Sequence, residues 1–479
     1  MLTIPSQLSR LFKSRLFLNI SVLGASTVIG KLIGLFNLGY IARAFGPENY
    51  GMIGFGTSVV AYAGILLSPG LMTWGTRDVA RHKENAGETV ISINLIQVAL
   101  AVLGFGLLLL FSHFFIHDEK QRMIVILCGL QLFQTALSIE WAFNGIEHSR
   151  VPAALSVISS AALSLCLILF IKNPTDIYLY LVLNFAILTL FVLVSYLIFF
   201  RHFKVRFSGP NLKSVRKAFI QSLPLNITTA LVVILHYANN LIVKYFLGSN
   251  ALGEFLAAFR LLELTNTIPG LLGTVFLPRI ARLKITDLPV AKEEARLFGQ
   301  INMILAFIIA PLILAESEAV ILVVFGTQFL SAAYLLGMMT FAMVFNFAIC
   351  GYTNVLISFG EDRVMLKIVI VSAAVSILGG LLLVPIFGVL GASIAICCID
   401  IAGWMVSMPT YRRIIGPLGL NKWMRPILAG CFLIGLSFVL KMTDIPMWSR
   451  LIAEGIVAVF FMAFFLIRLA KQSALLKHS

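Results

Sequence analysis

The stretch IYLYLVLNFAILTLFVLVSYLIFF at residues 177–200 is 24 residues long and contains no Asp, Glu, Lys or Arg. An α-helix needs about 20 consecutive apolar residues to cross the hydrocarbon core of a bilayer. The next segment, RHFKVRFSGPNLKSVRK at 201–217, carries six Lys and Arg. This change from an apolar run to a basic segment is typical of a transmembrane helix that ends at a membrane surface.

Apolar runs of this length recur along the whole chain. Of its 479 residues, 59% are hydrophobic and 12% are charged, whereas soluble domains are about 45–50% apolar and about 25% charged. We therefore expect an all-α integral membrane protein with about 14 transmembrane helices. The connecting segments are too short to fold as a soluble catalytic domain. The expected spans lie at residues 18–42, 51–73, 89–113, 123–143, 153–172, 177–200, 218–247, 254–277, 297–316, 330–357, 368–385, 389–408, 426–441 and 449–470.

The distribution of basic residues predicts the topology. The chain has 36 Lys and Arg against 21 Asp and Glu. If the N-terminus is cytoplasmic, the loops alternate and cations near a span end are counted with the adjacent side, 27 of the 36 fall on the cytoplasmic side and seven on the outer side. The remaining two, Lys31 and Arg260, lie deeper within spans. This is the positive-inside pattern of membrane proteins. The basic excess therefore indicates a topology with both termini in the cytoplasm, and we expect no nucleic-acid partner.

Two turns with the same residue spacing predict an internal repeat. FGPENYG at 45–51 follows the first span, and LGSNALG at 247–253 follows the seventh. A cation, Arg43 or Lys244, precedes each turn. Because six spans separate the turns, the two halves have the same orientation in the membrane, which is one of the known builds of secondary transporters.

The repeat and the basic segment together predict the domain organisation. We expect two parallel six-helix lobes joined by a cytoplasmic linker, followed by two additional helices. The boundaries are an N-terminal lobe at 1–200, the linker at 201–217, a C-terminal lobe at 218–410, and the added helices with a cytoplasmic tail at 411–479.

The sequence lacks the motifs of the common catalytic sites. It contains no P-loop, no H-E-x-x-H and no C-x-x-C, so ATP hydrolysis and a metal-dependent reaction are not expected. The six cysteines all fall within apolar runs, where small packing residues are the usual interpretation. We therefore predict that the protein is not an enzyme and has no catalytic residue, no metal site and no cofactor.

Cations within the spans are candidates for a binding site. A Lys or Arg at a helix centre costs about 2.5–3.5 kcal/mol on insertion scales, and such residues face a partner or a water-filled cavity. Lys31 lies in the middle of the first span, where it is either a cavity cation or part of a structural pair, or reaches the interface with its long side chain. Arg260 lies in the eighth span, and Glu263 is three residues further on the same helical face. These two form a structural pair or contribute to a polar site.

Three carboxylates lie in or near other spans. Asp400 is near the centre of the twelfth span, either as a carboxylate that binds and releases a proton or as a buried, hydrogen-bonded Asp. Glu140 is near the cytoplasmic end of the fourth span, where an interfacial role is favoured over ion coupling. Glu454 is expected near the outer interface, facing lipid.

Amides in the seventh span are candidates to line a polar cavity. Asn226, Asn239 and Asn240 present groups that hydrogen-bond to a hydroxyl-rich ligand. Hydrogen bonds between helices are the commoner reason for such residues in membranes, so both interpretations stay open.

Three stretches of the sequence are similar to one known family. Residues 42–82, ARAFGPENYGMIGFGTSVVAYAGILLSPGLMTWGTRDVARH, resemble its "G-P-x-x-Y-G … G … R-x-x-A-R" pattern. Residues 135–152, TALSIEWAFNGIEHSRVP, resemble its "W-x-x-x-G-x-E" stretch, and residues 325–396, FGTQFLSAA … VPIFGVLGASIAI, its "F-G-x-x-F-x-x-A … P-x-x-G-x-x-G-A-A" pattern. The family is the polysaccharide exporters of the multidrug/oligosaccharidyl-lipid/polysaccharide superfamily, in particular the O-antigen (Wzx-type) flippases.

A further stretch resembles the lipid II flippase branch of the same superfamily. Residues 257–282, AAFRLLELTNTIPGLLGTVFLPRIAR, are similar to its "A-x-R-L … P-R-x-x-R" segment. The resemblance implies a cavity arginine at Arg260. That branch carries several arginines in its first two spans, whereas here only Lys31 lies mid-membrane and Arg43 is near the outer end. Lys31, Arg43, Lys244 and Arg260 are therefore the candidate cations for a substrate.

The resemblance implies both a cargo and a location. The cargo would be an undecaprenyl-pyrophosphate-linked oligosaccharide, moved from the cytoplasmic to the periplasmic leaflet of a bacterial inner membrane. The implied partners are this lipid, the bilayer, and the polymerase and chain-length regulator of the same pathway. A lipid II flippase, a cation-coupled small-molecule exporter and a membrane-embedded glycan polymerase or ligase are the alternatives.

Overall fold

The computed structural model describes residues 15–67, 70–203, 205, 209, 212–416, 421–443 and 445–475. Within these ranges the chain consists of helices joined by short turns and contains no β-strand. The chain divides into two compact units, residues 1–237 and 238–479. The division falls inside one long helix, so that this helix belongs to both units.

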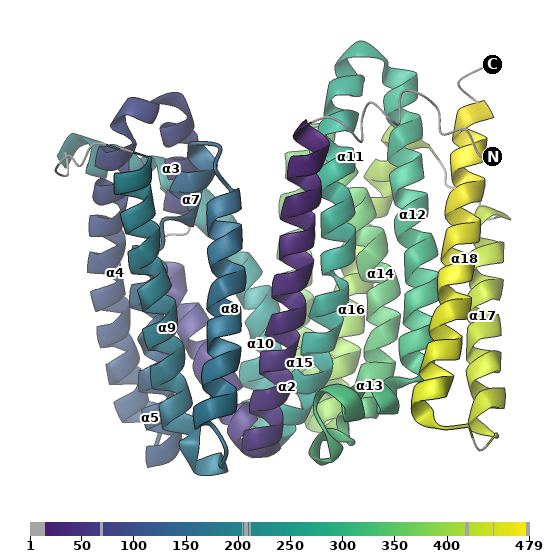
Figure 1. Cartoon of the computed structure of the whole chain (residues 1–479), viewed down its shortest axis with the longest axis horizontal. Helices are drawn as coiled ribbons and strands as arrows, with labels where there is room; N and C mark the ends of the chain where they lie inside the picture. The colour runs from purple at the N-terminus through teal and green to yellow at the C-terminus, as the bar shows by residue number, and fades with distance from the viewer. Residues whose placement is uncertain are drawn as a thin grey trace. The chain divides into compact units, whose positions relative to one another are not determined.

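Among the described residues, eight α-helices lie wholly in the first unit, and a ninth continues into the second. Figure 1 labels most of them. A π-helical turn, Ile198–His202, extends α9 at its C-terminal end. The helices are α2 (Arg15–Gly64), α3 (Gly70–Arg81), α4 (Ala86–Phe115), α5 (Glu119–Gly129), α6 (Gln131–Leu137), α7 (Glu140–Gly145), α8 (Arg150–Phe170), α9 (Ile177–Leu197) and the shared α10 (Leu212–Thr265).

The second unit continues from the C-terminal part of α10. Its longest helices are close to the length that spans a bilayer at 1.5 Å per residue. They are α11 (Thr267–Thr286), α12 (Leu288–Ala315), α13 (Ser317–Val324), α14 (Ala332–Ser358), α15 (Asp362–Phe387), α16 (Val389–Ile415), α17 (Asn421–Lys441) and α18 (Met447–Leu475).

The described residues contain twelve continuous helical stretches that are long and apolar enough to cross a membrane. Two of them, 29–67 and 229–286, are much longer than one bilayer. Each is broken at a glycine with non-helical torsion angles, Gly46 in α2 and Gly248 in α10. Divided at these glycines, the stretches correspond to the fourteen expected spans. The predicted fold class, an all-α integral membrane protein, is confirmed.

Glycines also allow helices to approach each other closely at two other places. In the first unit, a Cβ on Gly75 of α3 would lie 2.5 Å from the indole of Trp141, and one on Gly145 of α7 would lie 2.8 Å from Val79. In the second unit, a Cβ on Gly391 would lie 2.1 Å from the carbonyl oxygen of Leu383. All three glycines belong to the stretches that resemble the exporter family, so part of that resemblance reflects helix packing.

A buried apolar cluster of the first unit lies where α3, α4 and α7 meet. Leu71, Val79, Ile93, Trp141 and Phe143 form one buried cluster there. The indole nitrogen of Trp141 donates to the carbonyl oxygen of Ser138, and the Thr76 hydroxyl donates to the carbonyl oxygen of Trp141. The short helix α7 is therefore held on α3 by both packing and hydrogen bonds.

The second unit is built around α12, α14 and α16. The pairs α12–α14, α14–α16 and α15–α16 all pack along their lengths. The two C-terminal helices, α17 and α18, lie side by side and pack on α12 (Figure 1). Ile304 and Ile308 of α12 meet Leu433 of α17 and Phe465 of α18 in a shared apolar cluster.

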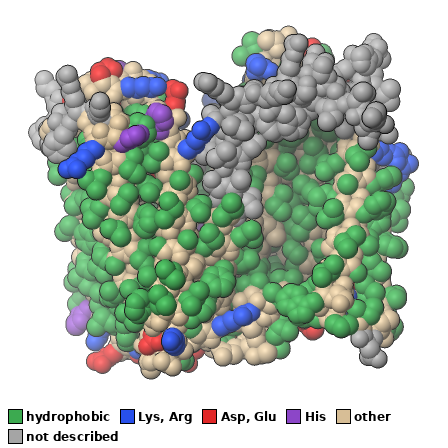
Figure 2. Space-filling model, viewed as in Figure 1, with side chains coloured by type: hydrophobic (Ala, Val, Ile, Leu, Met, Phe, Trp, Pro, Cys, Tyr) green, Lys and Arg blue, Asp and Glu red, His purple; other side chains and the backbone are tan. Residues whose placement is uncertain are grey.

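The surface has the polarity expected for a membrane protein. Large apolar side chains such as Phe115, Leu382 and Phe460 are exposed. On the visible faces of both units, hydrophobic side chains cover the middle, and Lys, Arg, Asp and Glu lie mostly towards the two ends of the helices (Figure 2). Exposed apolar area of this extent belongs in lipid. The chain is a multi-pass membrane protein.

The predicted domain boundaries stay predictions. The two compact units separate between Tyr237 and Ala238, in the middle of α10. The expected linker at 201–217 lies upstream of this point, and several of its residues lie outside the described ranges.

Candidate functional site

The candidate cations of the first unit lie on α2. Gly30 and Asn37 face α8: a Cβ on Gly30 would lie 3.6 Å from Val157, and the Asn37 amide donates to the carbonyl oxygen of Ser160 at 3.1 Å. Lys31 is exposed and displaced by about 100° around the helix from Gly30. Lys31 is therefore off the stripe that packs on α8.

Arg43 is exposed on the same helix, twelve residues after Lys31. Twelve residues of α-helix correspond to a rise of about 18 Å. This separation along the axis is too large for both cations to contact one phosphate group. The structure therefore does not bring the two predicted cations of the first unit together.

In the second unit, Arg260 forms the ion pair that its spacing predicts. A guanidinium nitrogen lies 2.6 Å from a carboxylate oxygen of Glu263, and both side chains are about one-third exposed or less. A role of Arg260 in binding a ligand stays a prediction. Lys244, the other candidate cation of this unit, donates to the hydroxyl of Ser249.

Asp400 is buried and hydrogen-bonded. It lies on α16 and accepts a hydrogen bond from the amide of Asn346 on α14 at 3.2 Å. The thiol of Cys350, one turn later on α14, contacts the Asn346 amide oxygen at 3.6 Å. This geometry matches the interpretation of Asp400 as a buried, hydrogen-bonded Asp. That its carboxylate binds and releases a proton during a transport cycle stays a prediction.

Glu140, the carboxylate expected near the membrane interface, begins a helix. It is the first residue of α7 and is exposed. A carboxylate is electrostatically favourable at a helix N-terminus. Its neighbour Trp141 is buried in the packed cluster with α3. A role of Glu140 in ion coupling stays a prediction.

The three candidate amides have different environments. Asn226 accepts a hydrogen bond from the backbone N–H of Gly70, the first residue of α3, at 2.7 Å. Asn239 and Asn240 are buried. The Asn239 amide nitrogen lies 3.5 Å from the Ser376 hydroxyl of α15, and its oxygen lies 2.5 Å from where a Cβ on Gly380 would be. Asn226 and Asn239 therefore make contacts between helices, and a cavity role for the three stays a prediction.

The structure contains a polar cluster that the sequence did not indicate. Glu316, between α12 and α13, is buried and bonded to both C-terminal helices. Its carboxylate accepts from Ser437 of α17 at 2.8 Å and from Arg450 of α18 at 2.9 Å, and the Lys441 ammonium lies 3.6 Å away. The expectation that Glu454 faces lipid is wrong, because this residue is fully buried beside the cluster.

Two other arginines bind across helices of the second unit. Arg279, in the stretch that resembles the lipid II flippase branch, forms an ion pair with buried Glu294 of α12. Arg296 donates to the carbonyl oxygen of Ile415 at the end of α16. Partners 15 and 119 positions apart carry no pairing signal in one sequence, so neither contact was predictable.

Known proteins match this chain both by family and by sequence over most of its length. Residues 16–284, more than half of it, match the family described as polysaccharide biosynthesis protein. An uncharacterized membrane protein of Methanocaldococcus jannaschii is 23% identical over 82% of this chain and 83% of its own length. A putative O-antigen transporter of Shigella flexneri is 30% identical over 148 residues, which are 30% of this chain and 29% of that protein.

Solved structures with a similar fold are also transporters and flippases. The inward closed form of the lipid II flippase MurJ has a TM-score of 0.71 and 13% identity, over 94% of this chain and 99% of that one. An outward-facing multidrug resistance MATE family transporter of the MOP superfamily has a TM-score of 0.57 and 15% identity, over 83% of this chain and 95% of that one.

The resemblance noted in the sequence is thus confirmed. The family match extends over the first unit and into α11, and the likeness in fold extends into the second unit. The chain is a multi-pass membrane protein that belongs to the polysaccharide biosynthesis protein family.

Proposed function

We propose that the protein flips an undecaprenyl-pyrophosphate-linked oligosaccharide repeat unit, of O-antigen or a similar surface polysaccharide, from the cytoplasmic to the periplasmic leaflet of a bacterial inner membrane. Membership of the polysaccharide biosynthesis family carries this proposal. The similarity to a putative O-antigen transporter and the fold shared with a lipid II flippase support it.

The cargo imposes two requirements on the protein. Its sugar–pyrophosphate head is polar and anionic and must be screened from hydrocarbon, while its lipid tail stays in the bilayer. We propose a cationic cavity that opens alternately to each side of the membrane. Lys31 and Arg260 are the cations proposed to donate charge-assisted hydrogen bonds to the pyrophosphate, and the pair with Glu263 would orient the guanidinium. Arg43 and Lys244 would attract the head group nearer the outer surface.

A flippase of this kind needs no ATP. A membrane potential contributes about 2.3 kcal/mol per elementary charge per 100 mV. With the inside negative, outward movement of an anionic head group is downhill, and polymerisation on the periplasmic side removes the product. The polymerase and chain-length regulator of the pathway would be the partners. If an ion is also coupled, Asp400, Glu140 and Glu263 are the carboxylates that we propose for it.

A deletion strain tests the proposed step directly. We expect undecaprenyl-linked single repeat units to accumulate on the cytoplasmic side while the surface polymer disappears. Lipid extraction with a leaflet-selective chemical label, together with staining of surface glycan, measures both. If repeat units still reach the periplasm but stay unpolymerised or unattached, the protein acts after the flip as an enzyme or assembly factor, and the proposal fails.

Two single substitutions test the cationic cavity. Lys31→Ala and Arg260→Ala should each lower export about tenfold or more, because a hydrogen bond to a charged group contributes about 1.5–3 kcal/mol. Arg150→Ala is the matched control, since it removes an exposed cation at the first residue of α8. Surface glycan and membrane protein level are measured together. Wild-type glycan in both cavity variants would contradict the proposed role of these cations.

A lipid II flippase is the second candidate function. The observation in its favour is the TM-score of 0.71 to the lipid II flippase structure, against 0.57 to the MATE transporter. Both cargoes are undecaprenyl pyrophosphates, so the same cations serve either one. Accumulation of peptidoglycan precursor in the deletion strain, with surface polysaccharide unchanged, would favour this candidate over the first.

A further inference from the structure

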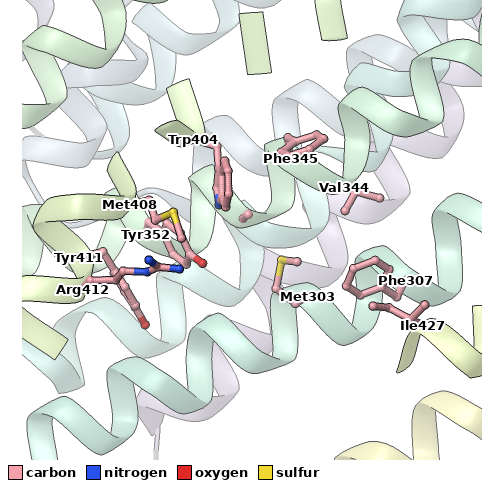
Figure 3. Close-up of a pocket in the computed structure, with 11 residues that line it drawn as sticks. Met303, Phe307, Val344, Phe345, Tyr352, Trp404, Met408, Tyr411, Arg412 and Ile427 are labelled. Atoms are coloured by element: carbon pink, nitrogen blue, oxygen red, sulfur yellow. The ribbon is translucent and has the colours of Figure 1, made fainter. Parts of the chain in front are cut away.

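The second unit contains a cavity of about 430 Å³ between four helices. Sites for small molecules have volumes in this range. The walls come from α12, α14, α16 and α17, and the side chains of these helices point towards a common space in Figure 3. None of the residues predicted from the sequence to bind cargo lines this cavity. It is lined by Met303, Phe307, Val344, Phe345, Ala348, Tyr352, Trp404, Met408, Tyr411, Arg412 and Ile427.

The two ends of the cavity differ in polarity. Arg412 is the one charged residue among the lining residues, and it lies next to Tyr352 and Tyr411 at one end (Figure 3). Val344, Phe307 and Ile427 lie at the other end (Figure 3). An occupant that matches this arrangement is an amphiphile with an anionic head and an apolar chain.

Arg412 differs from the other arginines at this end of α16. Arg296 is bonded to the carbonyl oxygen of Ile415, and Arg413 forms an ion pair with Glu361 at 3.1 Å. Arg412 is exposed, and no ion pair found within the described ranges involves it. Its guanidinium is therefore available to an anion at the mouth of the cavity.

The depth of the cavity fits one leaflet of a bilayer. Along α14, the eight residues from Tyr352 to Val344 correspond to a rise of about 12 Å. The hydrocarbon of one leaflet is about 15 Å thick, half of a core of about 30 Å. In the predicted topology, the C-terminal end of α16 with Arg412 lies at the cytoplasmic surface. A lipid whose phosphate is at Arg412 would therefore have its chain beside Trp404 and Phe345 and its methyl end towards Phe307.

We propose that this cavity binds an acyl chain of an anionic phospholipid of the cytoplasmic leaflet, with the lipid phosphate held by Arg412. The chain would lie between α12 and α17, beside the place where Gly430 brings these helices into close contact. A bound phospholipid would thus join α17 to α12, α14 and α16. The site is independent of the cargo and of the flippase proposal.

Trp404 provides a direct readout because it lines the cavity. Purified protein is reconstituted in vesicles of phosphatidylcholine with increasing fractions of phosphatidylglycerol that carries bromine on its acyl chains, since bromine quenches a nearby indole. The quenching of Trp404 is the difference between the fluorescence quenching of the wild-type protein and that of Trp404→Phe. We expect the quenching of Trp404 to reach half its maximum at a lower mole fraction of brominated phosphatidylglycerol than of brominated phosphatidylcholine.

The variants then test the assignment of the phosphate. Arg412→Gln should raise the half-maximal fraction of phosphatidylglycerol about fivefold, the effect of one Lys or Arg near a membrane surface. Arg413→Gln, the matched control on the next residue, should leave it unchanged. Equal quenching by the two lipids, or the same shift in both variants, would overturn the proposal. Elution as a single folded species in size-exclusion chromatography is required of each variant.

Two further measurements address the cavity and the identity of its occupant. Val344→Phe fills the apolar end and should abolish the quenching of Trp404 while Arg412 stays in place; full quenching in this variant would overturn the proposal. Undecaprenyl phosphate added at one equivalent should not displace the brominated phosphatidylglycerol. If it does, the cavity belongs to an isoprenoid tail, and the phospholipid assignment is wrong.

Discussion

The turn after the first span and the turn after the seventh have the same backbone but different surroundings. Gly46 has φ 74° and ψ 171°, and Gly248 has φ 87° and ψ −175°. This region of torsion space is open essentially to glycine alone. Each glycine joins two helical segments that together form one long stretch. The repeat predicted from FGPENYG and LGSNALG is therefore a repeat of backbone geometry.

The side chains around the two glycines do not repeat in the same way. In the first turn, the ring of Phe45 is buried and packs on Tyr180 of α9 at 5.7 Å, and the Asn49 amide donates to the carbonyl oxygen of Phe45 at 3.0 Å. In the second turn, Leu247 is only half-buried, and the neighbouring Tyr245 is 83% exposed. The first turn is thus packed against α9, whereas the hydrogen bond from Lys244 to Ser249 is local to the second turn.

The largest expected effect is the difference in stability lost when the apolar side chain of each turn is removed. Phe45→Ala should destabilise the protein by about 3 kcal/mol, the lower end of the range for a buried Phe. We expect the lower end because, within a bilayer, the substitution removes packing contacts, whereas the hydrophobic effect contributes little. Leu247→Ala should have a clearly smaller effect. Thermal unfolding in lipid nanodiscs measures both. Equal losses would show that the difference in burial has no energetic consequence.

The next effect tests what the turns share. Gly46→Ala and Gly248→Ala should each lower stability by about 1–3 kcal/mol, the strain of a side chain in this backbone region. For Gly248 the strain acts alone, since no atom lies within 4 Å of the added Cβ. Gly34→Ala is the control, because this glycine is helical and its Cβ also meets nothing. The control should be neutral or stabilising, as Ala is in a helix. A neutral Gly248→Ala would refute the argument from torsion angles.

The contrast between local geometry and tertiary contacts also explains which features of this structure one sequence predicts. Apolar runs and glycine turns are local signals, so the spans and both turns were predictable. The Arg260–Glu263 pair was predictable because its members are three residues apart on one helix. The bond from Gly70 to Asn226 joins residues 156 positions apart, and a single sequence contains no record of such a partner.

Charged residues inside spans were the hardest to place for the same reason. A carboxylate in an apolar run faces either lipid, water or protein, and only the neighbouring helices decide which. Glu454 is buried because α17 and α12 bring Ser437 and Glu316 to the same place as Arg450. The cavity beside Arg412 likewise forms only when four helices pack together, so no sequence motif predicts it.

The smallest expected effect concerns Glu147, the one non-glycine residue with positive φ within the described ranges, at 66°. It follows α7, and the bonds from His148 N–H to Phe143 O and from Glu147 N–H to Asn144 O form a Schellman motif, where glycine is usual. Glu147 also accepts a hydrogen bond from Lys83 at 3.0 Å, and this bond and the lysine charge lower the pKa of its carboxyl below the usual 4.5. Here a non-glycine residue occupies a position that suits glycine and makes a side-chain contact that glycine lacks.

Glu147→Gly therefore has two opposing effects on stability: it relieves the backbone strain, and it removes the pair with Lys83. Only the second effect depends on pH in this range. The lowered pKa means that the pair stabilises the fold above the ordinary pKa of Glu and is lost as the pH falls through the folded-state value. Near pH 7 the relief of backbone strain and the loss of the pair should nearly cancel. Towards pH 3.5 only the relief remains, so the melting temperature of Glu147→Gly should rise relative to wild type. Glu147→Ala loses the pair but keeps the strain, so it should be less stable near pH 7 and approach wild type in acid. If Glu147→Gly shows no gain in acid over Glu147→Ala, positive φ is not the constraint at this position.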